Sequence, residues 1–317
     1  MPLMSARFAL LNKRLLQLLL FLSAVLYFPL AAAEPVILGA DQPVPSLRSH
    51  LSWYRDSSGT LDVTDMIKLH QQGQFSPSAD FPSFGYTRDI VWITFAVSHQ
   101  DVAEQHWLLS IKPAFLDQVQ LFRLHNDELE DLGIQGDRAP WQNRDAPWRN
   151  ALFQLDMADN GDTRFFLRID STSSIAVQPK LWQTSQFVDA SASEMLLFGL
   201  LIATGTLLCA LSLFFLFMLR QRLYLYFFLY IAAFTFIVVQ LEGVIHLIIR
   251  PETALHIEWL QIIFQSIGMI AMALIFSEIT ELHKHHPRCN AWLVRGSLVL
   301  GVLGLTPALA GHDSLSI

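Results

Sequence analysis

The stretch DIVWITFAVS (residues 89–98) alternates in the way of a β-strand with one buried and one outer face. The predicted inner face carries Val91, Ile93, Phe95 and Val97, and the outer face carries Trp92, Thr94, Ala96 and Ser98. We expect the inner face to lie in a hydrophobic core. We assign Trp92 on the outer face to packing beneath a neighbouring loop, because most tryptophans are highly buried.

Several short segments resemble this stretch, and turn-forming residues separate them. They cover residues 106–111, 118–124, 151–157, 164–170 and 175–182. Closely spaced strands without long amphipathic helices between them are typical of an antiparallel sandwich or jelly roll. One short helix is predicted over residues 62–70, capped by Asp62 or Thr64. The sequence therefore predicts an all-β jelly-roll or sandwich domain.

The first 33 residues have the pattern of a secretory signal peptide. Basic residues precede a short apolar stretch, and Ala31-Ala32-Ala33 supplies the small residues of a cleavage site. The sequence becomes polar directly afterwards, at Glu34. An uncleaved N-terminal anchor is the alternative. We therefore expect residues 34–184 to form an exported domain and residues 185–194 to link it to the next part of the chain.

The expected exported domain is acidic and has no cysteine. Residues 34–194 contain 22 Asp and Glu against 12 Lys and Arg, a net charge of −10. This charge argues against nucleic acid or anionic lipid as a partner, because it repels phosphates. Cys209 and Cys289, the two cysteines of the chain, lie outside this domain. Its own core must therefore stabilise it, and a domain of this size can bury one.

Apolar runs dominate residues 195–311 and predict four membrane-spanning helices in contact with membrane lipid. The four predicted spans cover residues 195–219, 223–249, 257–279 and 291–310, and residues 312–317 form a short tail. The first run has 25 residues, about 37 Å as a helix, enough to cross a bilayer with some tilt. The sequence therefore predicts a helical membrane bundle behind the exported domain.

The basic residues between the predicted spans indicate the orientation of the bundle. If residues 34–194 are exported, Arg220 and Arg222 lie on the inner side, and so do Lys284 and Arg288. Arg250 alone lies on the outer loop. Positive residues prefer the cytoplasmic side, so their distribution agrees independently with the predicted signal peptide.

The segment GDRAPWQNRDAPWRN (residues 136–150) is the candidate ligand surface. Trp141 and Trp148 lie there in polar, loop-like sequence beside Arg144. Aromatic rings next to planar hydrogen-bonding groups suit a small polar ligand such as a sugar. The alternative is a loop held by pairs of Asp and Arg residues. We predict Trp141, Arg144 and Trp148 as ligand-binding residues.

Two polar stripes within the predicted spans are candidates for coupling. Glu242 and His246 are four residues apart near the outer end of the second span, on one face of the expected helix. Glu258, Gln261 and Gln265 form a similar stripe in the third span. We predict that Glu242 and His246 transmit the state of the exported domain inward. The alternative is that these residues only join helices or lie at the membrane interface.

No sequence pattern predicts catalysis, a cofactor or a metal. His283, His285 and His286 lie close to Cys289, but they lack the paired, separated spacing of a structural zinc site. The chain contains no Walker loop, nucleophile elbow or zinc-protease motif. We therefore expect no catalytic residues, no cofactor and no bound metal.

The order of the segments resembles a known bacterial receptor family. VWITF is followed by WLLSIKPAFLDQVQLF, by LGIQGDRAPWQNRDAPWRNALFQLDM and by TRFFLRIDSTSSIAVQPKLW, and the membrane part contains QLEGVIH and FSEITELHKHHP. This order is similar to the type 2 extracellular domain and membrane domain of the seven-transmembrane receptors with diverse intracellular signalling modules. The resemblance implies a periplasmic jelly roll related to carbohydrate-binding modules. It also implies a cytoplasmic output such as a diguanylate cyclase or histidine kinase.

We therefore predict a receptor in the inner membrane of a Gram-negative bacterium, with a periplasmic sensor domain that binds a small ligand. Four predicted spans instead of seven, and no output domain, lead us to expect a fragment of a longer receptor. Otherwise the chain would signal through a homodimer or a partner signalling protein. The alternative function is a membrane-anchored binding or scaffold module without signalling of its own.

Overall fold

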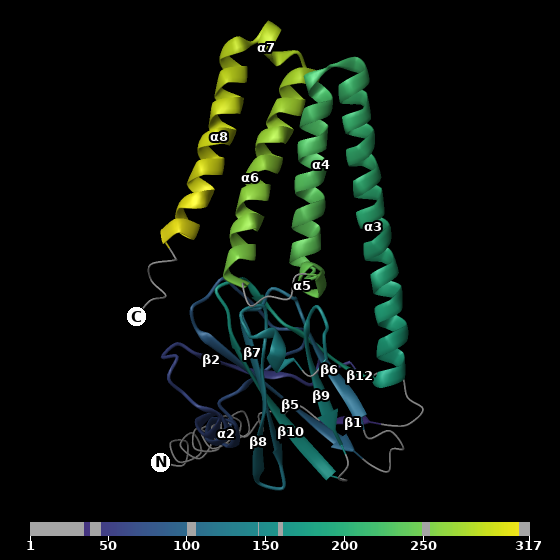
Figure 1. Cartoon of the computed structure of the whole chain (residues 1–317). Coiled ribbons are helices and arrows are strands. Elements are labelled where there is room, and N and C mark those ends of the chain that lie inside the picture. Colours follow the sequence, from purple (N-terminus) through teal and green to yellow (C-terminus); the bar gives the residue numbers. More distant parts are fainter. Residues whose placement is uncertain are drawn as a thin grey trace, which may run out of the picture.

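The computed structural model of the protein describes residues 35–38, 46–99, 106–144, 146–157, 161–248 and 254–310. Within them, a strand-rich domain precedes a set of long helices that stand at one end of it (Figure 1). This arrangement confirms the predicted fold class. The predicted signal peptide (residues 1–33) and C-terminal tail (residues 312–317) lie outside the described residues.

The described strands form three sheets. They are β1 (Val36–Leu38), β2 (Ser52–Asp56), β3 (Ser76–Pro77), β4 (Ser83–Gly85), β5 (Ile90–His99), β6 (His106–Lys112), β7 (Gln118–His125), β8 (Glu128–Gln135), β9 (Ala151–Asp156), β10 (Gly161–Asp170), β11 (Ile175–Ala176) and β12 (Gln178–Gln183). The large sheet has the order β3-β2-β5-β10-β7-β8, with β1 parallel to β5. A second sheet has the order β12-β6-β9, and β11 pairs with β4. Residues 90–98 of the stretch DIVWITFAVS thus lie in β5, between β2 and β10.

A common hydrophobic core lies between the large sheet and the β12-β6-β9 sheet. β5 contributes Val91, Ile93, Phe95 and Val97, which are the residues of the predicted inner face. Trp107 of β6 and Phe153 of β9 belong to the same core. Each such buried side chain contributes roughly 1.5–3 kcal/mol relative to an exposed one. Two sheets packed over one core form a sandwich, as the alternation predicted.

The outer face of β5 is covered by a helix. α2 (Val63–Gln71) begins with a capping box between Asp62 and Asp65, so the predicted helix and its Asp62 cap are confirmed. Trp92 is 1% exposed and stacks on Phe122, with ring centroids 6.0 Å apart. Met66 of α2 packs in the same cluster. Trp92 therefore has the packing role predicted for it, but it lies in a cluster with α2 and not beneath a loop.

The end of α2 is attached to the large sheet by His70, which makes the domain sensitive to acid. Arg164 of β10 donates a hydrogen bond from Nη1 to Nε2 of His70, 3.0 Å away. Burial, and secondarily the charge of Arg164, lower the pKa of His70 from 6.5 to about 4. The unfolded chain therefore takes up this proton at a higher pH than the folded chain, and stability falls as the pH drops from 6.5 to 4.

We expect His70→Gln to remove part of this acid sensitivity. Solvent screening of the partly exposed ring limits the loss due to His70 to about 1–2 kcal/mol between neutral pH and pH 4. Glutamine does not titrate, and its amide oxygen still accepts from Arg164. The check is thermal unfolding of the full chain and of His70→Gln at neutral and acidic pH. The same pH dependence in both proteins would contradict the assignment.

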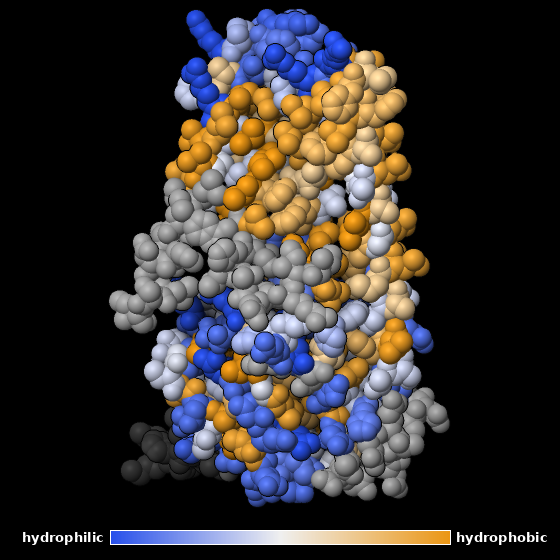
Figure 2. Space-filling view, viewed as in Figure 1, coloured by the Kyte–Doolittle hydropathy of each residue, from blue (hydrophilic) through white to orange (hydrophobic). Residues whose placement is uncertain are grey.

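The helices behind the sandwich stand side by side in the order α3, α4, α6 and α8 (Figure 1). They are α3 (Thr184–Leu219), α4 (Arg222–Leu241), α5 (Ile245–Ile248), α6 (Ala254–Ile279), α7 (Leu282–His285) and α8 (Pro287–Ala310). Among the described residues, α3, α4 and Leu260–Ile279 of α6 are long and apolar enough to cross a membrane. Hydrophobic residues gather over these helices, and hydrophilic residues cover the end that carries α7 (Figure 2). The fourth predicted span lies within α8. That α8 crosses the membrane stays a prediction.

Among the boundaries of the described helices, two differ most from the sequence prediction. Residues 185–194, predicted as a linker, form the first part of α3, because no proline or glycine interrupts them. α4 ends at Leu241 instead of continuing to residue 249. Gly243 has a φ of 71°, a left-handed conformation that ends a helix and favours glycine. α3 is therefore one continuous helix from the sandwich into the bundle.

Candidate functional site

The 136–150 loop (Gly136–Asn150) connects β8 to β9, and Arg144 holds it together. Arg144 donates from Nη1 to the carbonyl oxygen of Trp148 at 2.6 Å and from Nη2 to that of Gly136 at 2.7 Å. Its guanidinium carbon lies 4.6 Å from the centroid of the Trp141 ring. Arg144 thus contacts both predicted ligand-binding tryptophans and fixes the shape of the loop.

The guanidinium of Arg144 stays charged although the loop buries it. Burial lowers its pKa to about 10, and the carboxylate of Asp137 opposes this shift. The guanidinium is therefore protonated at neutral pH. The Trp148 ring packs edge-on against Phe187 of α3, with centroids 5.2 Å apart. The structure thus places Trp141 against Arg144 and Trp148 against α3, so the two rings have different neighbours.

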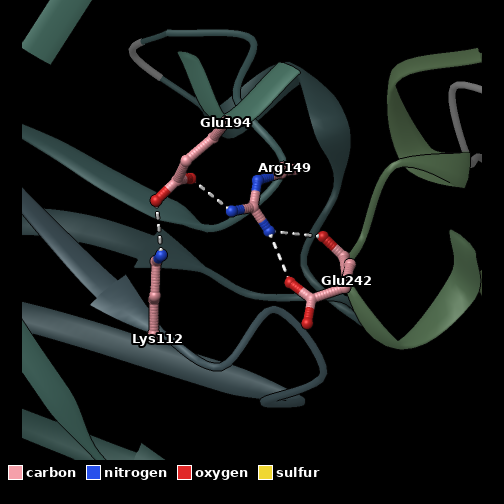
Figure 3. A network of polar contacts seen from close by, with 4 residues as sticks. All are labelled: Lys112, Arg149, Glu194 and Glu242. Carbon is pink, nitrogen blue, oxygen red and sulfur yellow. Dashed lines mark hydrogen bonds and ion pairs between the residues drawn. The ribbon is translucent and has the colours of Figure 1, made fainter. Parts of the chain in front are cut away.

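Arg149, the residue after Trp148, connects the loop to two membrane helices (Figure 3). Its side chain is only 2% exposed. Nη2 donates to the Glu194 carboxylate of α3 at 2.5 Å. Nη1 donates to the carboxylate of Glu242, after the end of α4, at 3.0 Å and to the Glu242 carbonyl oxygen at 2.8 Å. The forked guanidinium therefore holds both helices to the sandwich.

Lys112 completes this network, which we call the junction cluster (Lys112, Arg149, Glu194 and Glu242). Lys112, at the end of β6, donates from Nζ to the second carboxylate oxygen of Glu194 at 2.8 Å (Figure 3). Two positive and two negative side chains balance one another in this cluster. The Glu194 and Glu242 side chains are 35% and 48% exposed, so both carboxylates can also reach water. Either carboxylate can therefore leave its ion pair for water at a moderate cost in free energy.

Close backbone packing accompanies these ion pairs. A Cβ atom at Gly243 would lie 2.6 Å from the Cβ atom of Ala114 and 2.8 Å from the carbonyl oxygen of Arg149. Such distances leave no room for a side chain. Gly243 therefore allows the α4–α5 turn to touch the sandwich directly, beside the junction cluster.

Both predicted coupling residues face the strand-rich domain, but they do not share a helix. Glu242 follows the last residue of α4, whereas His246 belongs to α5. The prediction of one helix face is wrong, because the left-handed Gly243 turns the chain between them. Glu242 pairs with Arg149. His246 is 6% exposed and lies outside the spanning helices, and burial together with the nearby Arg144 lowers its pKa to about 4.

Comparison with known families gives two matches in the order of the two structural parts. The model described as 7TMR-DISM extracellular 2 matches residues 48–183, and the model described as 7TM diverse intracellular signalling matches residues 194–317. The chain belongs to the seven-transmembrane receptors with diverse intracellular signalling modules. It is a membrane protein with an external domain. No curated protein matches the chain.

In this receptor the junction cluster joins the two family domains. Lys112 and Arg149 belong to the residues matched as the external domain, whereas Glu194 and Glu242 belong to those matched as the membrane domain. Sequence reasoning found Glu242 but missed the other three residues. Arg149 is 45 residues from Glu194 and 93 from Glu242, so no local pattern marks the pairing. The one available signal was the charge of Glu194 directly before the apolar run of the first span.

Proposed function

We propose that this receptor lies in the inner membrane of a Gram-negative bacterium and detects a small ligand in the periplasm. The signal peptide predicted over residues 1–33 supports export of the external domain. The basic residues expected on the opposite side of the bundle support the same orientation.

The proposed ligand surface is the 136–150 loop, with Trp141, Arg144 and Trp148 as its binding residues. The loop holds two partly exposed indole rings at fixed positions, and aromatic rings are suitable stacking faces for a sugar. Since both Nη groups of Arg144 donate to loop carbonyls, Arg144 would act mainly by positioning the rings. A sugar is our first candidate ligand.

The proposed coupling route runs from this loop into α3 and α4. The observation that carries it is the position of Arg149, which follows Trp148 in the chain and binds Glu194 and Glu242. A ligand that shifts the loop would shift Arg149 relative to both helices. His246 lies close to Arg144 and would respond to the same movement. The ligand must bind one arrangement more tightly than the other, since equal binding shifts no equilibrium.

On the cytoplasmic side, we propose that the helices bias an output module. The family resemblance implies a diguanylate cyclase or a histidine kinase, in the same polypeptide or in a partner signalling protein. The packing order α3, α4, α6 and α8 gives each helix a neighbour through which a displacement of α3 or α4 can spread.

We expect the full chain in lipid nanodiscs to bind a member of a panel of neutral and acidic mono- and disaccharides. Combined replacement of Trp141 and Arg144 by alanine should weaken this binding at least about tenfold, through loss of the stacking face and of the loop geometry. Tryptophan fluorescence and calorimetry measure it. Tyr86→Ala is the control, because Tyr86 is an exposed aromatic residue outside the loop. Tight binding that survives the double replacement would refute the site.

A further inference from the structure

Four buried nitrogen atoms lack a hydrogen-bond partner where the sandwich meets the α4–α5 turn. They are Nε of Arg144, Nε of Arg149, Nδ2 of Asn150 and Nδ1 of His246, and no partner for them occurs in the part of the chain that the structure describes. Asn150 is 1% exposed and His246 is 6% exposed. A buried polar atom without a partner is costly, and in native proteins such an atom usually contacts an ordered water molecule or an ion. Their concentration at one contact therefore indicates a bound species.

The four nitrogens belong to one small region of the junction. Nη1 of Arg144 lies 3.5 Å from the carbonyl oxygen of Asn150, six residues along the same loop. The backbone N–H of His246 donates to the carbonyl oxygen of Gly243 at 3.2 Å, and the backbone of Gly243 packs on that of Arg149. The charge of Arg144 is also close enough to His246 to lower its pKa. The loop and the turn thus bring these side chains together.

The chemistry of these atoms favours an anion over a water molecule. Nε of an arginine and Nδ2 of an asparagine carry hydrogen and can only donate. Nδ1 of the neutral His246 ring also donates in one of its two tautomers. A buried water molecule donates hydrogen bonds of its own and therefore needs acceptors around it. An anion accepts from every neighbour, so a group made of donors suits it better.

We propose that Arg144, Asn150 and His246 bind a small inorganic anion, such as chloride, between the 136–150 loop and the α4–α5 turn. The guanidinium supplies positive charge, and the amide and the imidazole supply further donors. The Asn150 and His246 side chains are already enclosed, so the site does not depend on what else contacts the bundle. The anion joins the loop to the turn beside the junction cluster without any saccharide, and this binding site goes beyond the proposed function.

Thermal unfolding of the full chain in nanodiscs tests the site, with chloride replaced by gluconate at constant ionic strength and no saccharide present. Gluconate is too large to be enclosed in this way. Chloride that binds only the folded chain should raise Tm by at least about 5 °C at a hundredfold excess over its dissociation constant. Asn150→Asp should lose this rise, because it replaces an enclosed donor by a negative charge. Asn126→Asp is the matched control, since it makes the same change at an exposed residue, and it should keep the rise.

Calorimetric titration of chloride into the chain in gluconate measures binding directly. The parent chain should bind one chloride, whatever the stability of the variants. His246→Phe keeps a ring of similar size without ring nitrogens and should raise the dissociation constant at least about fivefold. The proposal is overturned if the parent chain binds no chloride, if Asn150→Asp and Asn126→Asp respond alike, or if His246→Phe binds as the parent does. In these cases the donors hold an ordered water molecule only, or chloride acts elsewhere on the chain.

Discussion

Arg149→Ala is expected to lower the free energy of unfolding of the external domain by about 3 kcal/mol, or roughly 6–12 °C in Tm. The replacement removes a guanidinium that is 2% exposed together with its bonds to Glu194 and Glu242. Breaking a buried ion pair costs about 3–5 kcal/mol when the partner stays buried. Here both carboxylates are partly exposed, and Glu194 keeps Lys112, so the lower end of that range applies.

The measurement is thermal unfolding of the full chain in nanodiscs, followed by tryptophan fluorescence. Arg48→Ala is the matched control, because Arg48 pairs with Asp80 and both side chains are more than half exposed. We expect the control to cost less than about 1 kcal/mol. Arg149→Lys should fall between the two, since lysine keeps the charge but not the fork. If Arg149→Ala and Arg48→Ala have the same Tm, the junction cluster does not hold the domain.

The same variant separates binding from coupling. Hydrogen exchange of Thr184–Glu194 in α3 should increase in Arg149→Ala, because the salt bridge that fixes this part of the helix is lost. A saccharide identified with the parent chain should still bind, because Trp141 and Arg144 are unchanged. It should no longer alter exchange in α3. Transmission that persists without Arg149 would contradict the proposed route.

The faces of β5 could be predicted from sequence because they depend on local alternation. Val91 and Trp92 point to opposite sides of any extended chain. Which elements pack against each side depends on the tertiary structure. The sequence also predicted the helix α2, which covers the outer face, because a capping residue marks its start. The sequence could not show that Met66 packs in the cluster of Trp92, since the two segments meet only when β2, β5 and β10 form a sheet.

The sequence did not predict β8, because β8 is an edge strand whose first four residues are exposed. Its sequence, ELEDLGIQ, has acidic residues where a half-buried strand has apolar ones. The turn before it was the usable signal. Asn126 and Asp127 both have positive φ, the geometry of a two-residue hairpin, and these residue types favour it. The junction cluster could not be predicted in this way, because its charges are far apart in the chain and adjacent only in the fold.

Gly243→Ala is expected to separate the α4–α5 turn from the external domain and to cost about 2–4 kcal/mol. The backbone at Gly243 has a φ of 71°, which alone costs an alanine about 1–2 kcal/mol. The added methyl group would also meet Ala114 at 2.6 Å and the Arg149 carbonyl oxygen at 2.8 Å. Neither atom belongs to a flexible side chain, so the turn itself must move.

Comparison with Gly85→Ala isolates the steric part of this effect. Gly85 has a φ of 64°, close to that of Gly243, but no atom lies within 4 Å of an added Cβ. It should show only the backbone cost. The difference in Tm between the two variants in nanodiscs therefore measures the contact between turn and domain. Equal losses would mean that Gly243 serves the turn alone.

Combining Gly243→Ala with Arg149→Ala shows whether packing and charge act at one contact. If the displaced turn takes Glu242 away from Arg149, the ion pair is already broken in Gly243→Ala. The double variant should then lose little more stability than the more damaging single variant, because residues in contact are not additive. Losses that add fully would mean that the domain is held at two independent points. A movement of the ligand loop at one of them would then leave the other in place, and a single coupling route through Arg149 would be excluded.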